Sequence, residues 1–221
     1  FRSLLGRHMV FPVLAAIAVA WREGRDPAGT CRKLETMEAL RGRMQAVRLA
    51  SGALLIRDDF KSNRESLQAA LQVLRDYPAT RKILVLGGVA EIPSREQYQY
   101  FRQLGREIAA SVDHAVLFLR KNSFRRCRNQ ALEAGMDPGS LVRAEEDPLS
   151  ALPHIPSPLG EGDLILVKGR NEYRTARLSL ALTGNRVTCR LASCRVPVDC
   201  DDCELLAGDD RENPLLAPNL N

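Results

Sequence analysis

The sequence predicts an α/β protein with a Rossmann-like, mostly parallel sheet that is covered by helices on both faces. Short apolar runs alternate along the chain with helix-like segments of about a dozen residues, which is the order of a parallel sheet with crossover helices. The run at residues 82–86 is apolar from Ile83 onward and ends in Gly87-Gly88, as expected for a strand buried on both faces. Residues 44–49 and 53–56 flank Ser51-Gly52, a hairpin signal.

Periodicity and turn residues define the expected elements. The predicted strands cover residues 44–49, 53–56, 82–86, 115–119, 141–142 and 163–167. The predicted helices cover residues 8–23, which should be mostly buried, residues 30–40 with a cap at Thr30, the segments opened by Ser62 and Ser94, and residues 123–134 and 172–182. The helix after Ser62 has a capping-box pattern with Glu65 and one apolar stripe, made by Leu67, Ala70, Leu71 and Leu74.

These elements divide the chain into four parts. Residues 1–42 form helices and a linker, residues 43–185 form the α/β domain, residues 186–207 form a cysteine-rich segment, and residues 208–221 form a loose polar tail. Because Phe1 opens directly on an apolar stretch with no preceding structure, we expect the chain to be a fragment of a longer protein.

The charge balance gives little indication of the partner. The chain has 32 Lys and Arg against 27 Asp and Glu, a net charge of +5 that is spread over most of its length. The densest basic cluster, residues 120–128, includes only Phe124 as an aromatic residue, which favours a solvated helix face over a nucleic-acid site. The apolar stretch 9–21 is too short to span a membrane, so we expect a cytoplasmic protein.

The stretch 53–66 is the strongest candidate for a site. An apolar strand runs into Asp58 and Asp59, and Lys61 and a helix start follow. In open α/β sheets, ligands bind at the carboxyl ends of the strands, where this turn should lie. The alternative is that the two carboxylates only end a strand and that Ser62 only caps a helix.

An ordered set of short motifs resembles the C-terminal portion of the Mur ligase family. The resemblance covers roughly residues 4–183 and is carried by Leu5-Gly6-Arg7-His8, residues 14–20, Arg41-Gly42-Arg43-Met44, Ile56-Arg57-Asp58-Asp59, Val85-Leu86-Gly87, Ala90-Glu91 and Leu166-Val167-Lys168-Gly169. It implies the end of a central ATPase domain followed by a complete C-terminal domain.

The family resemblance also implies a reaction. A full-length Mur ligase uses ATP with Mg²⁺ to phosphorylate a carboxylate on a nucleotide-linked peptide, and an amine then attacks the acyl phosphate during peptidoglycan (cell wall) biosynthesis. The family's phosphate-binding loop and carbamylated lysine lie upstream of the matched region. We therefore expect no catalytic residue on this chain, ATP and Mg²⁺ held mostly by other parts of the protein, and no turnover by this chain alone.

Four positions match family residues with known roles. Arg43 matches an arginine that reaches the ATP phosphates on domain closure, and Asp59 an acidic residue that accepts from the ribose hydroxyls. Lys61 matches a lysine near the nucleotide, where it would stabilise charge on the transferred phosphoryl group. Lys168 matches a lysine near the incoming amine substrate.

The chain departs from the family pattern near the expected adenine site. Met9 and Pro12 stand where the family has asparagines, and neither can read the edge of a base. An alternative function is therefore a catalytically inactive, ligase-like scaffold that uses the cysteine-rich segment for interaction. His8 is expected to be a cap or core contact, and Gly87-Gly88 lacks the glycine spacing of a dinucleotide site.

The cysteine-rich segment suggests a metal. Cys189, Cys194, Cys200 and Cys203 fall close together, and the last two have the spacing of a zinc knuckle. A closed, structural Zn²⁺ site is the favoured interpretation, with unligated thiols and disulfides as alternatives. The remaining two cysteines, Cys31 and Cys127, are predicted to pack in the core.

Overall fold

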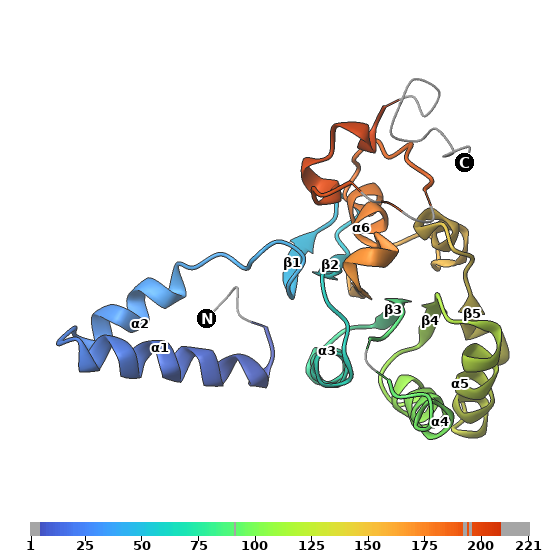
Figure 1. The fold of residues 1–221 in the computed structure, drawn as a ribbon, viewed down its shortest axis with the longest axis horizontal. Helices are drawn as coiled ribbons and strands as arrows, with labels where there is room; N and C mark the ends of the chain where they lie inside the picture. Colours follow the sequence, from blue (N-terminus) through green and yellow to red (C-terminus); the bar gives the residue numbers. More distant parts are fainter. Residues whose placement is uncertain (1–4, 91, 192–193, 195, 209–221) are drawn as a thin grey trace.

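A six-stranded mixed sheet organises the computed structural model, which describes residues 5–90, 92–191, 194 and 196–208 (Figure 1). The strand order is β1-β2-β6-β3-β4-β5; β1 is antiparallel to β2 and all other neighbours are parallel. The strands are β1 (Gln45–Arg48), β2 (Leu54–Asp58), β3 (Arg81–Gly87), β4 (His114–Leu117), β5 (Leu141–Arg143) and β6 (Asp163–Gly169). The predicted mostly parallel sheet and its hairpin are confirmed.

Helices cover both faces of this sheet, as predicted. Helices α3, α4 and α5 pack on one face, and α6 with the short segment η3 packs on the other (Figure 1). The helices are α1 (Val10–Arg22), α2 (Pro27–Glu35), α3 (Arg64–Asp76), α4 (Gln97–Ala109), α5 (Lys121–Glu133) and α6 (Ala176–Leu182). Short 3₁₀ segments are η1 (Arg7–Met9), η2 (Pro138–Ser140), η3 (Pro148–His154), η4 (Asn171–Tyr173), η5 (Cys200–Asp202) and η6 (Glu204–Leu206).

Strand β3 shows how the sequence builds the two-layered core. Ile83 and Val85 are fully buried on the face of α6, whereas Leu84 and Leu86 are fully buried on the face of α3. Because successive strand residues point to opposite faces, an uninterrupted apolar run is what a doubly covered strand requires.

The start of α3 differs by one residue from the prediction. Asn63, not Ser62, is the N-cap: its Oδ1 accepts from Ser66 N at 2.9 Å, and Ser66 Oγ accepts from Asn63 N at 3.1 Å. Ser62 belongs to the preceding turn, since its carbonyl accepts from Ala90 N at 2.7 Å. The predicted apolar stripe is confirmed, because its four members are at most 1% exposed.

The N-terminal helices extend to one side of the sheet domain (Figure 1). The predicted burial of the first helix is wrong: within the described residues, Val13 is the one buried side chain of α1, and Phe11 and Trp21 are 76% and 72% exposed. Helix α1 packs against α2 and no described element covers its outer apolar side. Helix α2 starts earlier than predicted, because the Asp26 carboxylate caps the backbone N–H groups of residues 28 and 29.

The last predicted helix is interrupted. Segment η4 ends at Arg174, which adopts a left-handed conformation with φ of 50°, and α6 begins two residues later. Thr175 packs between the ends of β3 and β6, where a side chain on either Gly87 or Gly169 would overlap it. The glycines therefore allow the start of α6 to lie directly on the carboxyl end of the sheet.

Candidate functional site

The turn after β2 meets the end of β6 at the centre of the sheet. Asp58 and Lys168 are register partners on these parallel strands, and Lys168 Nζ lies 2.5 Å from Asp58 Oδ2. The same ammonium donates to the carbonyl of Lys61 at 2.9 Å, and Asp58 Oδ1 accepts from Met44 N at 3.2 Å. One ion pair thus fixes the turn, the end of β6 and the start of β1 together.

Lys168 was predicted to lie near a substrate, and the structure places it inside the protein. Its side chain is fully buried, and burial lowers its pKa while the charge of Asp58 opposes that shift. In this arrangement the ammonium is directed at the turn and away from solvent.

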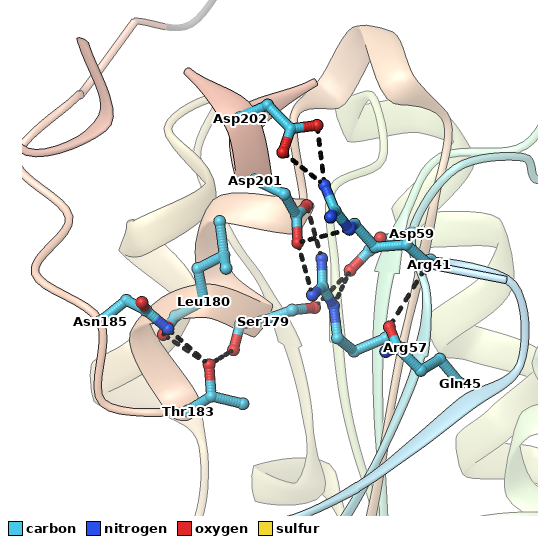
Figure 2. A network of polar contacts seen from close by, with 11 residues as sticks. Arg41, Gln45, Arg57, Asp59, Ser179, Leu180, Thr183, Asn185, Asp201 and Asp202 are labelled. Atoms are coloured by element: carbon cyan, nitrogen blue, oxygen red, sulfur yellow. Dashed lines mark hydrogen bonds and ion pairs between the residues drawn. The ribbon is translucent and has the colours of Figure 1, made fainter. Parts of the chain in front are cut away.

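Asp59 is also buried, but its two oxygens have different surroundings. Oδ2 accepts from Arg57 Nε at 3.2 Å and from Ser179 Oγ at 2.5 Å (Figure 2). Within the described residues no donor is found for Oδ1, which faces Gly42: a Cβ on that glycine would lie 2.6 Å from it. Burial raises the pKa of Asp59, and the Arg57 charge and the Ser179 hydroxyl act against this.

Arg43 and Lys61 are the two cations predicted to contact the ATP phosphates. Arg43 lies just before β1 and Lys61 just after β2, both next to Asp59. Arg43 follows Gly42 and its guanidinium carbon lies 4.5 Å from the ring centroid of Phe60, the residue after Asp59. Both Arg43 and Lys61 are exposed. The structure therefore brings three predicted site residues, Arg43, Asp59 and Lys61, to one end of β2, and leaves both cations accessible to an anionic ligand.

The cysteine-rich segment contributes two carboxylates to this site, which the sequence did not predict. Asp201 forms a bidentate pair with both terminal nitrogens of Arg57 at 2.8 and 2.9 Å, and both oxygens of Asp202 accept from the single nitrogen Nη1 of Arg41 at 2.7 Å (Figure 2). Burial acts to lower the pKa of Arg57, but its two carboxylate partners, Asp59 and Asp201, outweigh it and raise the pKa. A charged residue inside an otherwise apolar strand was the available signal for Arg57.

The predicted zinc site is not supported. Among the described residues no group of three or more His, Cys, Asp or Glu side chains could hold a metal ion, and all six cysteines are free thiols. The thiols of Cys189, Cys194, Cys200 and Cys203 line one small cavity together with Arg174 and Arg177.

Arginines hold the segment where zinc was expected. Arg174 donates to the carbonyls of Cys194, Val196 and Val198 at 2.8 to 3.3 Å, and Arg177 donates to the carbonyl of Leu191 at 2.5 Å. The positive charges of Arg174 and Arg177, which line the cavity, disfavour a divalent cation there, and their guanidinium groups satisfy the backbone carbonyls of an irregular segment.

A wider cleft lies beyond the carboxyl ends of β4 and β5. It has a volume of about 700 Å³ and its lining carries charges of both signs, from Arg120, Arg143, Glu145, Glu146, Asp147 and Glu172. Asp147 is paired with Arg190 at 2.8 Å, and Glu172 with Arg170 at 2.7 Å.

Comparison with known proteins identifies the family. The model of the family described as "Mur ligase, glutamate ligase domain" matches residues 42–171, more than half of the chain. The chain belongs to the Mur ligase family. Its similarity includes the branch that adds D-alanyl-D-alanine: UDP-N-acetylmuramoyl-tripeptide--D-alanyl-D-alanine ligase of Escherichia coli is 32% identical over 120 residues, which cover 54% of this chain and 26% of the relative.

Other Mur ligases match a longer part of the chain. UDP-N-acetylmuramoyl-L-alanyl-D-glutamate--2,6-diaminopimelate ligase of Chlorobaculum tepidum is 29% identical over 181 residues, covering 79% of this chain and 34% of the relative. The chain therefore spans about a third of the length of these relatives, or less.

Solved Mur ligases share the fold. MurF of Acinetobacter baumannii superimposes with a TM-score of 0.68 at 24% identity, covering 81% of this chain and 38% of that protein. MurF of Thermotoga maritima, solved in complex with ADP, gives a TM-score of 0.63 at 19% identity, covering 80% of this chain and 38% of that protein.

A search of the described helices for a membrane span found none that combines the required length with sufficient apolar character.

Proposed function

We propose that the protein carrying this chain is an ATP-dependent amide-bond ligase that acts on peptidoglycan precursors, and that this chain supplies nucleotide and amine-side contacts. The observation that carries the proposal is the gathering of Arg43, Asp59 and Lys61 at the carboxyl end of β2 in a Mur ligase C-terminal domain. A turn without cations, or an apolar turn, at this position would not suit a nucleotide.

Each of the three residues has a role that its chemistry fits. Asp59 Oδ1 is an acceptor suited to a ribose hydroxyl, since Oδ2, the other oxygen of this carboxylate, is already held by Arg57 and Ser179. The Arg43 guanidinium suits the oxygens of the ATP phosphates, and the Lys61 ammonium suits the charge that develops on the transferred phosphoryl group. Mg²⁺ and most of the ATP contacts belong to sequence outside this chain.

The reaction we propose has two steps. A carboxylate oxygen attacks the γ-phosphorus of ATP and ADP leaves, and the substrate amine then attacks the acyl carbon and phosphate leaves. No residue of this chain is assigned to proton transfer or nucleophilic attack. Its contribution is to orient the nucleotide and the amine substrate when the domains close.

Nucleotide entry requires the linker that precedes β1 to move. The cavity beside Asp59 measures about 20 Å³, which is far below the volume of a ribose, and Arg41 and Gly42 are part of its lining. The pair between Arg41 and Asp202 is exposed on both sides, at 52% and 63%, so water and salt screen it and it holds the linker only weakly.

We assign the amine substrate to the 700 Å³ cleft rather than to direct contact with Lys168. The cleft offers Arg120 and Arg143 for a carboxylate and Glu145 and Glu146 for an ammonium group, a combination that suits a zwitterionic amino acid or dipeptide. Lys168 is not among the residues that line this cleft; its contacts fix the turn that carries Asp59 and Lys61.

The test is substrate-dependent ADP release by the whole product of the gene that encodes this chain. We expect ADP only when a UDP-linked muramyl peptide and an amine are both present, with D-alanyl-D-alanine and single amino acids assayed in parallel and the amide product detected by mass spectrometry. Release of ADP without an amine would contradict the proposal. Absence of ADP release and of amide product with all of these combinations would favour the scaffold alternative.

A further inference from the structure

The cysteine-rich segment places one carboxylate inside the charged network around Asp59. Asp201 is 12% exposed at its side chain, and Arg57, its bidentate partner, is 6% exposed. Its neighbour Asp202 is 63% exposed and pairs with Arg41, also on the surface. Two adjacent carboxylates of one short segment therefore have very different environments.

The geometry of Arg57 determines what Asp59 can do. A guanidinium has a terminal edge and a side edge, and each can bind a carboxylate with two parallel hydrogen bonds. Asp201 occupies both terminal nitrogens of Arg57, at 2.8 and 2.9 Å. The side edge of Arg57 faces Asp59, and in the orientation that the pair with Asp201 fixes, the contact runs from Nε to Oδ2 at 3.2 Å.

The second oxygen of Asp59 is consequently kept for another donor. Ser179 also donates to Oδ2, so both recorded bonds hold the same oxygen. Oδ1 faces Gly42 of the linker, and both residues belong to the lining of the small cavity. Movement of the linker uncovers Oδ1, while the bonds from Arg57 and Ser179 keep the carboxylate in place.

We propose that Asp201 is a positioning residue for nucleotide binding, which acts through Arg57 to keep Asp59 Oδ1 free to accept a hydroxyl of the ribose. Without the carboxylate of Asp201, the guanidinium is free to turn and bind both oxygens of Asp59, and the acceptor is lost. This inference rests on the proposed function and deepens it, because it makes the cysteine-rich segment part of the nucleotide site.

The test compares Asp201→Asn with the matched variant Asp202→Asn in the whole gene product. The readouts are kcat and KM for ATP, 2′-deoxy-ATP and 3′-deoxy-ATP. We expect Asp201→Asn to raise the KM for ATP about tenfold and to reduce the preference for ATP over one of the deoxy analogues to nearly none. Asp202→Asn should change both quantities by less than about twofold, and Asp201→Glu should retain the preference.

Two results would overturn the inference while leaving the proposed function intact. One is an Asp201→Asn enzyme that keeps the wild-type preference for the ribose hydroxyls while Asp59→Asn loses it; the ligase function and the role of Asp59 would then stand without Asp201. The other is a crystal structure of the Asp201→Asn chain in which Arg57 contacts Oδ2 alone, as it does here; we expect it to contact both oxygens of Asp59. If Asp59→Asn itself keeps the preference, the ribose assignment in the proposed function fails, and this inference fails with it.

Discussion

Asp58 and Lys168 face each other across the parallel strands β2 and β6 and form a buried ion pair with 2.5 Å between Oδ2 and Nζ. The pair is possible because β6 is inserted between β2 and β3, so that strands far apart in sequence become neighbours. It places a positive charge under the turn that carries Asp59 and Lys61, and it connects the centre of the sheet to the candidate nucleotide site.

Breaking this pair should cost much stability. Lys168→Met strands the carboxylate of Asp58 in the interior, and we expect a loss of about 3 to 5 kcal/mol in the free energy of unfolding. The double variant with Asp58→Asn removes both charges of the pair and keeps an acceptor for Met44 N, so it should recover about 1 kcal/mol or more. Urea denaturation measures both, and strictly additive effects would contradict the pairing.

Gly42 should be required both for its backbone conformation and for its small size. Its φ is +65°, and a Cβ would lie 2.6 Å from Asp59 Oδ1. Gly24 has a similar φ of +72° but has open space around it. Gly24→Ala should therefore cost about 1 kcal/mol for the left-handed backbone alone, and Gly42→Ala about 2 kcal/mol or more. Equal losses in thermal unfolding would show that Asp59 is not where the structure places it.

Close packing of α4 on α5 predicts a further effect at Gly105. A side chain at Gly105 would overlap the backbone carbonyl of Cys127 on the neighbouring helix. Cys127 itself is fully buried, as predicted. Gly105→Ala should destabilise the protein by about 1 to 3 kcal/mol, even though alanine is the better helix former by about 1 kcal/mol. Gln103→Ala, on the exposed side of α4, should stay within about 0.5 kcal/mol of wild type. A stabilised Gly105→Ala protein in urea denaturation would rule out the helix contact.

The pair of Arg81 and Asp163 at the start of β3 and β6 predicts a pH dependence. Arg81 donates to both carboxylate oxygens, at 2.8 and 2.6 Å, and these bonds lower the pKa of Asp163. The stability that the pair contributes is therefore present above the unfolded pKa of about 3.9 and is lost as the pH falls through the lower folded value.

The matching variant is Asp163→Asn, which we expect to cost about 1 to 2 kcal/mol at pH 7. The difference from wild type should shrink below about pH 4, as Asp163 becomes protonated in the wild type. Glu172→Gln, which removes an exposed pair with Arg170, should change the free energy of unfolding by less than about 0.5 kcal/mol at every pH measured. Urea unfolding at pH 7, 5 and 3 measures this, and a constant difference across the series would be incompatible with a lowered pKa.

The elements that the sequence predicted well are those with a local signal. The continuous apolar run at residues 83–86 and the helical spacing of the stripe from Leu67 to Leu74 indicate their burial directly, and Asp59 with Lys61 follows an apolar strand. Arg43 could be added only through the family resemblance, because nothing in its immediate neighbours indicates that it lies next to Phe60.

The rest of the site depends on contacts between distant segments. Arg57 meets Asp201 from 144 positions away, and the burial of Lys168 depends on the strand order, which periodicity does not specify. The zinc prediction, which the structure does not support, rested on the local spacing of Cys200 and Cys203. Arg174, which donates to the backbone carbonyls of this segment, comes from the end of η4 and is distant in sequence. The predicted polar tail, residues 208–221, lies almost entirely outside the described residues.

We propose above that this chain is part of a ligase that activates a carboxylate by phosphorylation. The most direct test follows oxygen from a carboxylate that is labelled with ¹⁸O at both positions, in a reaction run by the whole gene product with ATP and the amine substrate. If the carboxylate attacks the γ-phosphorus, one labelled oxygen leaves with the inorganic phosphate and the other remains in the amide. Unlabelled phosphate, or label recovered in AMP, would contradict the account.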